Sequence, residues 1–254
     1  MSMKISVITV CYNSDKTIGH TLRSVREQTH SDVEHIIVDG GSQDNTLVVV
    51  KADGLHVAKV VSERDNGIYD AMNKGIALAS GEIVGFINAD DFYASPDSLA
   101  TVAAAFAKSG ADSCYGDLCY VSQIDPTQTV RYWRSSAFLL GSFEKSWCPP
   151  HPTFFVRRSV YQRLGGFDLS FKIAADFELM ARYLAASRIS SHYIPEVLVK
   201  MRLGGTTNRS LSNILKQNVE IRRALSKNGL HSSLLSFVLN KLVTRAIQFV
   251  SRPA

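Results

Sequence analysis

Short apolar runs alternate with amphipathic segments through the first hundred residues of the chain. Continuous apolar stretches predict buried strands near 5–11, 34–39, 56–62 and 83–88. Between them, helical spacing of apolar residues predicts helices near 16–29, 45–53, 68–79 and 97–108. Strands that alternate with helices build a mostly parallel sheet with right-handed crossovers, so the pattern predicts an α/β fold with helices flanking a central sheet.

The second half of the chain is less regular. Its apolar and β-branched runs predict strands over 113–121, 129–133 and 190–200, and its helical spacing predicts helices over 157–164 and 175–187. Two further amphipathic segments, 211–228 and 234–250, predict C-terminal helices separate from the sheet. Glycine pairs and Asn-Gly steps between these segments mark the connecting loops.

Polar loops follow three of the predicted strands in the first half. The first strand ends in Tyr12-Asn13-Ser14-Asp15, the second in Asp39-Gly40-Gly41-Ser42, and the fourth in Asn88-Ala89-Asp90-Asp91. The carboxyl ends of parallel strands meet at one edge of a sheet, and ligands of open α/β sheets bind there. The three loops are therefore expected to share one rim.

Asp90 and Asp91 are adjacent carboxylates at the end of an apolar strand. Two neighbouring carboxylates repel each other, so a bound cation such as Mg²⁺ or Mn²⁺ is a natural way to keep both ionised. The alternative is a turn that caps the following helix, where Asp and Asn are common.

Six motifs occur in an order that resembles family 2 glycosyltransferases, the inverting enzymes with the GT-A fold. They read VITVCYNS, IIVDGGSQDNT, SERDNGIYDAMNKGIALASGE, FINADD, HPTFFVRRSVYQRLGGFD and KIAADFELMAR. The resemblance covers about residues 4–205. It implies a catalytic domain over 1–205, with a nucleotide-sugar half over 1–93, an acceptor half over 94–205, and a basic helical extension over 206–254.

The resemblance assigns a donor-binding role to the first rim loops. Asp39 is expected to accept the N3–H of uracil, although a carboxylate suits guanine equally and an Asp here can also serve only the turn. Ser14, Asp65 and Lys74 are weaker candidates for the same pocket. Asp65 has a competing role as a cap of the helix that begins near Ile68.

The resemblance also implies a divalent cation, Mn²⁺ or Mg²⁺, bridging the two phosphates of the donor. By the resemblance, Asp91 contacts the metal, and Asp90 either contacts the ribose or supports the metal. The family often writes this motif DxD, and here Asn88 stands at the first position. Asn88 adds no charge, which leaves open which of the two carboxylates contacts the cation. Arg202, before a glycine pair, is a further candidate to reach the diphosphate.

The acceptor half contains one expected general base. By the resemblance, Asp176 at the start of a predicted helix removes the proton from the acceptor hydroxyl. The alternative is that Asp176 only stabilises the start of this helix, where the helix dipole favours a negative charge. Glu178 and His151, the latter set between prolines, are acceptor-side candidates.

Charge is distributed unevenly along the chain. Residues 202–254 contain nine Lys or Arg and one acid, Glu220, for a net charge of +8, which leaves −3 of the total +5 for the rest. Such a tail favours an anionic partner, and the cations on the polar face of 234–250 suit an in-plane membrane helix. Packing on the core or on a second subunit, as in a homodimer, is the alternative. Nucleic acid is disfavoured because no aromatic-interleaved basic groove is visible.

The remaining features bound the environment and the function. Four cysteines without a CxxC pair predict reduced thiols, and no signal peptide or membrane span is evident, so a cytoplasmic protein at the inner face of the membrane is expected. The sequence thus predicts a metal-dependent hexosyltransferase that uses a nucleotide-diphosphate sugar, with a UDP-sugar favoured. Its expected acceptor is lipid-linked or a glycan in cell-surface assembly. A nucleotidyltransferase or a non-catalytic nucleotide-sugar-binding module is the alternative.

Overall fold

The computed structural model of the protein describes residues 3–204 and 211–232, together with Phe237 and Asn240. Within these residues nine strands form one sheet in the order β3-β2-β1-β4-β8-β6-β9-β5, with β7 paired to β6. The strands are β1 Ile5–Cys11, β2 Val33–Asp39, β3 Val57–Ser62, β4 Ile83–Phe86, β5 Phe92–Tyr93, β6 Ser113–Val121, β7 Thr129–Trp133, β8 Phe155–Arg157 and β9 Ser191–Arg202. The α-helices are α1 Ile18–Arg26, α2 Thr46–Asp53, α3 Ile68–Leu78, α4 Ser98–Ser109, α5 Arg158–Leu164, α6 Ala175–Met180 and α7 Leu211–Lys227. Shorter helices are η1 Phe143–Lys145, η2 His151–Thr153 and η3 Ala181–Ala186, the last of which continues α6 as a π-helix.

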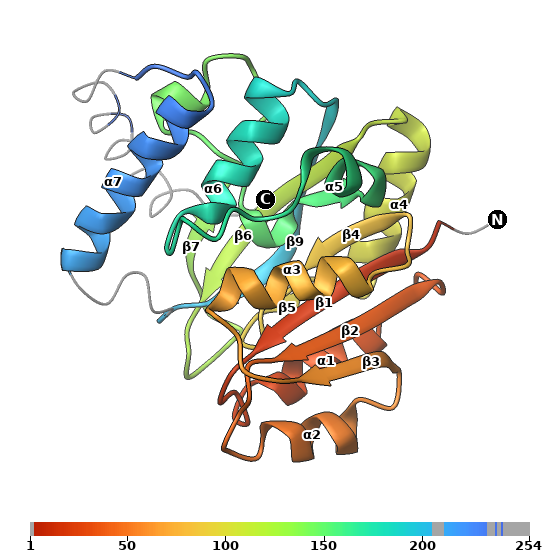
Figure 1. The fold of residues 1–254 in the computed structure, drawn as a ribbon. Coiled ribbons are helices and arrows are strands. Elements are labelled where there is room, and N and C mark those ends of the chain that lie inside the picture. Colours follow the sequence, from red (N-terminus) through yellow and green to blue (C-terminus); the bar gives the residue numbers. More distant parts are fainter. Residues whose placement is uncertain (1–2, 205–210, 233–236, 238–239, 241–254) are drawn as a thin grey trace.

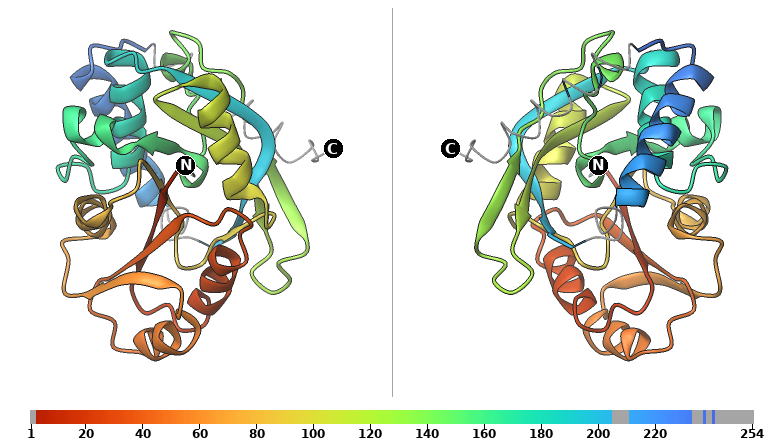
Figure 2. Two further views of the ribbon diagram at one scale, coloured as in Figure 1. Left: turned by 90° about the vertical axis from the view of Figure 1, so that its right-hand side faces the viewer. Right: turned by 90° about the vertical axis from the view of Figure 1, so that its left-hand side faces the viewer.

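The first half is a doubly wound parallel sheet. Strand β1 pairs in parallel with β2 on one side and β4 on the other, and β3 pairs in parallel with β2. Helix α3 packs on β1 and β2, whereas α1 packs against α2, and Figure 2 shows α1 and α3 on opposite sides of the sheet. Because all four strands run the same way, the loops after β1, β2 and β4 meet at one edge, as the sequence predicts.

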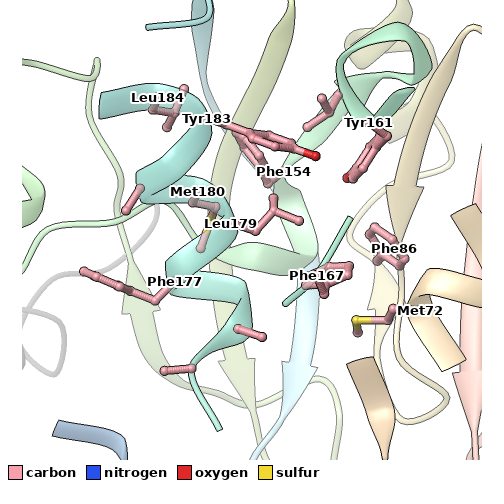
Figure 3. Packing of buried hydrophobic residues seen from close by; sticks show 14 of the residues in the cluster. Met72, Phe86, Phe154, Tyr161, Phe167, Phe177, Leu179, Met180, Tyr183 and Leu184 are labelled. Carbon is pink, nitrogen blue, oxygen red and sulfur yellow. The ribbon is translucent and has the colours of Figure 1, made fainter. Parts of the chain in front are cut away.

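Alternate residues of the strands fill two cores. Ile8 and Val10 of β1 join the cluster under α3, α5 and α6, whereas Ile5 and Val7 join the cluster under α4. This is the period of two expected of a strand that is buried on both faces. Figure 3 shows the larger cluster, in which aromatic and aliphatic side chains fill the space between α6 and the sheet.

Antiparallel strands enter in the second half. The three-residue β8 lies between β4 and β6 and pairs antiparallel with both, while β6 and β9 are parallel to each other. The expected α/β class with helices flanking a largely parallel sheet is confirmed. Strands β5 and β8 are absent from the elements predicted by sequence, because two or three residues are too short for a recognisable period.

The C-terminal region joins the body through α7. This helix packs beside α6 (Figure 1), and the predicted range 211–228 agrees with the observed one. Of the predicted helix 234–250, only Phe237 and Asn240 lie within the described residues. Phe237 is 3% exposed and belongs to the larger core cluster. No helix in the described part of the chain is long and apolar enough to cross a bilayer.

Candidate active site

The loops after β1 and β2 are fastened to each other by hydrogen bonds. The amide of Asn13 donates to Oγ of Ser42 at 2.8 Å, and the amide of Gln43 donates to Oδ1 of Asn13 at 2.9 Å. Asn13 adopts a left-handed backbone with φ of 48°, which asparagine tolerates better than most residues. The two loops thus form one continuous wall of the rim.

Asp39 organises the turn after β2. Its carboxylate is buried and accepts hydrogen bonds from the amides of Gly41 and Ser42 at 3.1 and 3.0 Å, and from the hydroxyls of Ser42 and Ser62. Burial alone would raise the pKa of Asp39, but these donors outweigh burial and lower it. Asp39 is therefore an ionised centre of the turn, and its expected contact with a nucleobase stays a prediction.

Asp65 lies against the same wall from the loop before α3. Its Oδ1 accepts the amide of Gly67 at 2.9 Å and so shapes the turn before α3. The N-cap of α3 is Gly67 and has no side-chain cap, so Asp65 is not the cap of this helix. A Cβ atom built on Gly40 would lie 2.5 Å from Oδ2 of Asp65, so a larger residue here would push this carboxylate out of its present position. Tyr12 borders Gly40 and is 62% exposed. The sequence-based interpretation passed over Tyr12, although a large aromatic residue directly after a strand could have signalled it.

The other two weaker candidates for the nucleotide pocket, Ser14 and Lys74, are held by local contacts. Ser14 donates from its hydroxyl to the carbonyl of Tyr12 at 3.2 Å, and so shapes the first loop. Nζ of Lys74 lies 2.8 Å from Oε1 of Glu63 and donates to the carbonyl of Arg64 at 3.1 Å. The ammonium of Lys74 thus fastens the loop before α3.

Asp91 is buried behind the end of β4. Its Oδ2 accepts from the side-chain amide of Asn88 at 3.1 Å, and its Oδ1 accepts from the backbone amide of Arg202 at 3.3 Å. Burial, followed by the charge of Asp90, raises the pKa of Asp91 well above its usual range. Asp90 is only partly buried, so it is the more accessible carboxylate of the pair.

The guanidinium of Arg202 is held behind the two carboxylates. It donates to the carbonyl of Asp90, contacts Nδ1 of His20 and lies over the ring of Phe92 with Cζ 5.0 Å from the centroid. Arg202 is 8% exposed. In this arrangement it supports the rim from inside, and its expected contact with a diphosphate stays a prediction.

Asn88 and Asp90, two residues apart after β4, offer oxygen atoms of the kind that a divalent cation binds. Oδ1 of Asn88 is buried and has no hydrogen-bond partner among the described residues, which leaves an oxygen ligand unused. The described residues contain no group of three or more His, Cys, Asp or Glu side chains that could hold a metal. Magnesium-type sites in such proteins use one or two carboxylates and complete their shell with substrate phosphate and water, so this donor set is adequate.

Asp176 lies in the first turn of helix α6 and lines a cavity beside the rim. Oδ1 of Asp176 accepts from the hydroxyl of Tyr69 at 3.2 Å and from the amide of Phe177 at 2.8 Å. The same cavity, about 440 Å³ in volume, is lined by Asn88. The end of β4 and the first turn of α6 are thus brought to one space from positions 88 residues apart in sequence.

Aromatic and polar side chains complete the cavity. Its wall includes Trp133, Trp147, Arg131, Arg134, Met180, Gln217 and Ile221. His151 also lines it and stacks on Phe86 with ring centroids 5.5 Å apart. Burial lowers the pKa of His151 and the charge of Asp176 opposes that effect, so the ring is neutral near pH 7. His151 therefore lies where an acceptor-side residue was expected.

The position of Glu178 differs from the one expected of an acceptor-side residue. Its carboxylate is fully buried and faces Arg182 at 3.1 Å and Lys227 at 3.3 Å, and it is absent from the cavity wall. Two residues along a helix turn the side chain through about 200°, so Glu178 points away from the space that Asp176 faces. Glu178 is a structural ion-pair residue and does not face an acceptor.

Comparisons with known proteins agree with this geometry. Residues 6–168 match the family described as "Glycosyl transferase family 2". An uncharacterized glycosyltransferase of Mycobacterium tuberculosis, Rv1514c, is 34% identical over 181 residues, covering 70% of this chain and 68% of that protein. The PGL/p-HBAD biosynthesis glycosyltransferase Rv2957 of the same organism is 29% identical over 210 residues, covering 80% and 78%.

Two solved structures share the fold. Staphylococcus aureus TarS, residues 1–349 in complex with UDP-GlcNAc, superposes with a TM-score of 0.71 at 19% identity, covering 95% of this chain and 73% of that one. The mannosyltransferase PcManGT from Pyrobaculum calidifontis, in complex with GDP-Man and Mn²⁺, gives a TM-score of 0.62 at 20% identity, covering 100% and 82%.

Proposed function

The chain belongs to glycosyl transferase family 2, and from that premise we propose that it is an inverting, metal-dependent hexosyltransferase. It moves one sugar from a nucleotide-diphosphate sugar to an acceptor hydroxyl. The observation that carries the proposal is that Asp176 and Asn88 line the same cavity. For this reaction the general base and the residues that face the donor phosphates must border the same space. Asp176 is the proposed base, and Asn88 is the proposed residue on the phosphate side.

Asp176 is the general base of the proposed transfer. It accepts the proton of the acceptor hydroxyl while that oxygen forms a bond to the anomeric carbon, and the bond to the nucleoside diphosphate breaks on the opposite face. One displacement from the opposite face inverts the configuration. Oδ1 of Asp176 accepts from the amide of Phe177 and from the hydroxyl of Tyr69, whose one proton is shared with the carbonyl of Ile173, and this leaves Oδ2 for the proton.

The metal corner is proposed to consist of Asp90 and Asn88, with Asp91 behind them. A bound Mn²⁺ or Mg²⁺ would neutralise the charge that builds on the leaving diphosphate. This assignment exchanges the expected roles of the two acids, because both oxygens of Asp91 already accept hydrogen bonds within the protein. Asp90 is the carboxylate with access to a ligand.

The nucleoside pocket is proposed to lie along the wall formed by the loops after β1 and β2. Tyr12 offers an exposed ring for a base, and Asp65 offers Oδ2 beside Gly40 for a base N–H. Asp39 and Ser14 hold that wall in shape. A uridine nucleotide is favoured, in line with the UDP-GlcNAc bound to TarS, although PcManGT holds GDP-Man.

The acceptor is proposed to be a lipid-linked sugar or a glycan of the cell surface. The name of the relative Rv2957 places it in PGL/p-HBAD biosynthesis, which supports an acceptor of this kind. Trp133 and Trp147 in the cavity wall suit the apolar face of a sugar ring. Because such an acceptor is held in a membrane, we propose that the protein acts at the inner face of the membrane as a peripheral protein. Helix α7 packs on α6, so we propose that it belongs with the acceptor half and that the domain extends beyond residue 205.

Product analysis tests the proposal. The protein is incubated with Mn²⁺, a membrane-lipid extract as acceptor and, in turn, UDP-glucose, UDP-galactose, UDP-N-acetylglucosamine and GDP-mannose. We expect one donor to release nucleoside diphosphate and to label the acceptor. Release of pyrophosphate would instead identify a nucleotidyltransferase, and binding without turnover of any donor would identify a binding module.

A further inference from the structure

Glu220 of α7 holds the segment of chain that leads into Asp176. Its carboxylate accepts the backbone amides of Lys172 at 3.0 Å, Ile173 at 2.8 Å and Ala174 at 2.9 Å. These are the three residues before helix α6 begins at Ala175. Figure 1 shows α7 lying beside α6, the arrangement that allows this reach.

The contact fixes the segment of chain just before α6, and it differs from an ordinary helix cap. The first amides of a helix have no partner within the helix, and a capping side chain usually accepts them. The residue at the cap position here is Ala174, which offers no side-chain acceptor. Glu220 does not take that place, because the amides it accepts belong to residues 172–174, ahead of the first helical residue Ala175. It fixes the chain that enters α6, and its negative charge suits the positive end of the helix dipole.

Tyr69 holds the same segment from the other side. Its hydroxyl lies 2.9 Å from the carbonyl of Ile173 and 3.2 Å from Oδ1 of Asp176. The amides of this segment therefore face α7 and one of its carbonyls faces α3. With both sides fixed, the first turn of α6 has little freedom to move its carboxylate.

We propose that Glu220 is a positioning residue for the general base Asp176. This rests on the proposed function of Asp176. Glu220 does not line the cavity, whereas Gln217 and Ile221 of the same helix do, so it acts through the backbone of residues 172–174 and not on substrate. The C-terminal helix is accordingly a working part of the active site.

The decisive variant is Glu220→Gln, which keeps the size of the side chain but turns one oxygen into a donor that faces amides. Nucleoside diphosphate release is measured with the donor that the wild type turns over fastest in the panel above and the same lipid extract. We expect kcat to fall roughly 10- to 100-fold, since small misplacements of a catalytic group cost this much. The donor KM should stay within about twofold, because the nucleotide wall is untouched.

The matched control is Arg222→Gln on the same helix, an exposed side chain whose neutralisation should leave kcat and KM unchanged. A Glu220→Gln variant with wild-type kcat, or one that loses kcat only in proportion to donor binding, would overturn the proposal. Loss of the whole fold in Glu220→Gln would equally overturn it, by assigning Glu220 to stability of the domain.

A double-mutant cycle distinguishes failure of this proposal from failure of the general-base role proposed for Asp176. If Glu220 acts through Asp176, Asp176→Asn and the double variant Asp176→Asn/Glu220→Gln should share the same residual kcat. Additive losses would show that Glu220 acts elsewhere. Near-normal kcat in Asp176→Asn alone would refute the base assignment itself, independently of what Glu220 does.

Discussion

The hydroxyl of Tyr69 lies 3.2 Å from Oδ1 of Asp176, across 107 residues of sequence. The contact joins α3 to α6. Burial, reinforced by the neighbouring charge of Asp176, raises the pKa of Tyr69 well above its usual range, so the phenol remains a hydrogen-bond donor at any working pH. The orientation of Asp176 is therefore set partly by α3, which belongs to the half of the protein that is proposed to hold the donor.

Tyr69→Phe tests this orientation. The variant keeps the ring and loses the hydroxyl, so we expect kcat to fall roughly tenfold and the free energy of unfolding to fall by about 1 kcal/mol, the net value of one such hydrogen bond. Turnover and urea unfolding are both measured. Tyr193→Phe is the control, because its hydroxyl donates to the carboxylate of Asp117 at 2.8 Å away from the cavity wall. Equal kcat losses in the two variants would contradict the assigned role of Tyr69.

Asp176→Asn tests the base directly. Asparagine keeps the shape of the side chain but cannot accept the acceptor proton at neutral pH. We expect turnover to fall roughly 10²- to 10⁴-fold, the usual contribution of a general base, with donor affinity within a few-fold of wild type. Calorimetry and product release are the measurements. Near-normal turnover would place the base elsewhere, and the burial of Glu178 in its ion pairs disfavours that residue as the substitute.

Much of the fold can be predicted from the local pattern of apolar and polar residues. Strands over 113–121 and 129–133 occupy the ranges that the apolar pattern predicts, and the rim follows from three strand ends. Strand β8 was missed because Phe155–Arg157 forms a strand only through its two neighbours, β4 and β6, which come from distant segments. Pairing of that kind leaves no period in a three-residue run.

For the same reason, only part of the candidate site could be predicted from the sequence. Asp176 and Asn88 belong to motifs that a sequence displays, and they do reach one cavity. The distinction between the accessible Asp90 and the buried Asp91 depends on Arg202, which arrives from 111 residues away. The role of Glu220 depends on where α7 docks. Long-range contacts of this sort have no signature in a single sequence.

Metal removal should weaken donor binding at the rim. With a chelator present, we expect calorimetry with UDP to show at least a tenfold weaker affinity than with Mn²⁺, because the diphosphate loses its counter-charge. Asp90→Asn should reproduce that loss and make further Mn²⁺ ineffective.

Asp91→Asn is the matched comparison for the metal corner, with the same change one residue along. Because Asp91 is buried among donors, its variant should lose stability more than Mn²⁺ dependence. The reverse ranking would return the metal contact to Asp91, the residue that the family resemblance favours.

Glu34 should make folding stability depend on pH. Its carboxylate is 5% exposed and accepts from the hydroxyls of Ser6 at 2.6 Å and Ser80 at 2.8 Å, with Lys59 at 3.3 Å. Burial alone would raise the pKa of Glu34, but these partners lower it to about 2. An unfolded Glu titrates near ~4.3. The stabilisation is therefore complete above that pH and is lost as the pH falls toward about 2.

Urea unfolding of Glu34→Gln across pH measures this effect. At pH 6.5 the variant should be less stable than wild type by on the order of 2 kcal/mol, and the gap should close between about pH 4.5 and 2. Glu27→Gln is the control, because that side chain is 63% exposed and should give no such pH-dependent gap. A gap that stays constant down to pH 2 would mean that Glu34 contributes shape and not charge.

The last prediction concerns membrane attachment by the end of the chain. Phe237 is buried in the core, so the apolar face predicted for 234–250 is at least partly taken up by the protein itself. Residues 241–254 lie outside the described residues and contain Lys241, Arg245 and Arg252 beside apolar side chains. Cations near an anionic bilayer contribute about 1 kcal/mol each, which is enough for reversible attachment when apolar insertion adds to it.

We therefore expect the full chain to sediment with phosphatidylglycerol liposomes at low salt and less so at high salt, because salt screens the cations. A chain ending at Asn240 keeps Phe237 in place, and should lose sedimentation while its UDP affinity is unchanged. Lys241→Gln/Arg245→Gln, at full length, should show an intermediate loss, which separates charge from insertion. If the full chain ignores liposomes, or if truncation changes a dimer into a monomer by light scattering, this segment serves the core or a subunit interface instead.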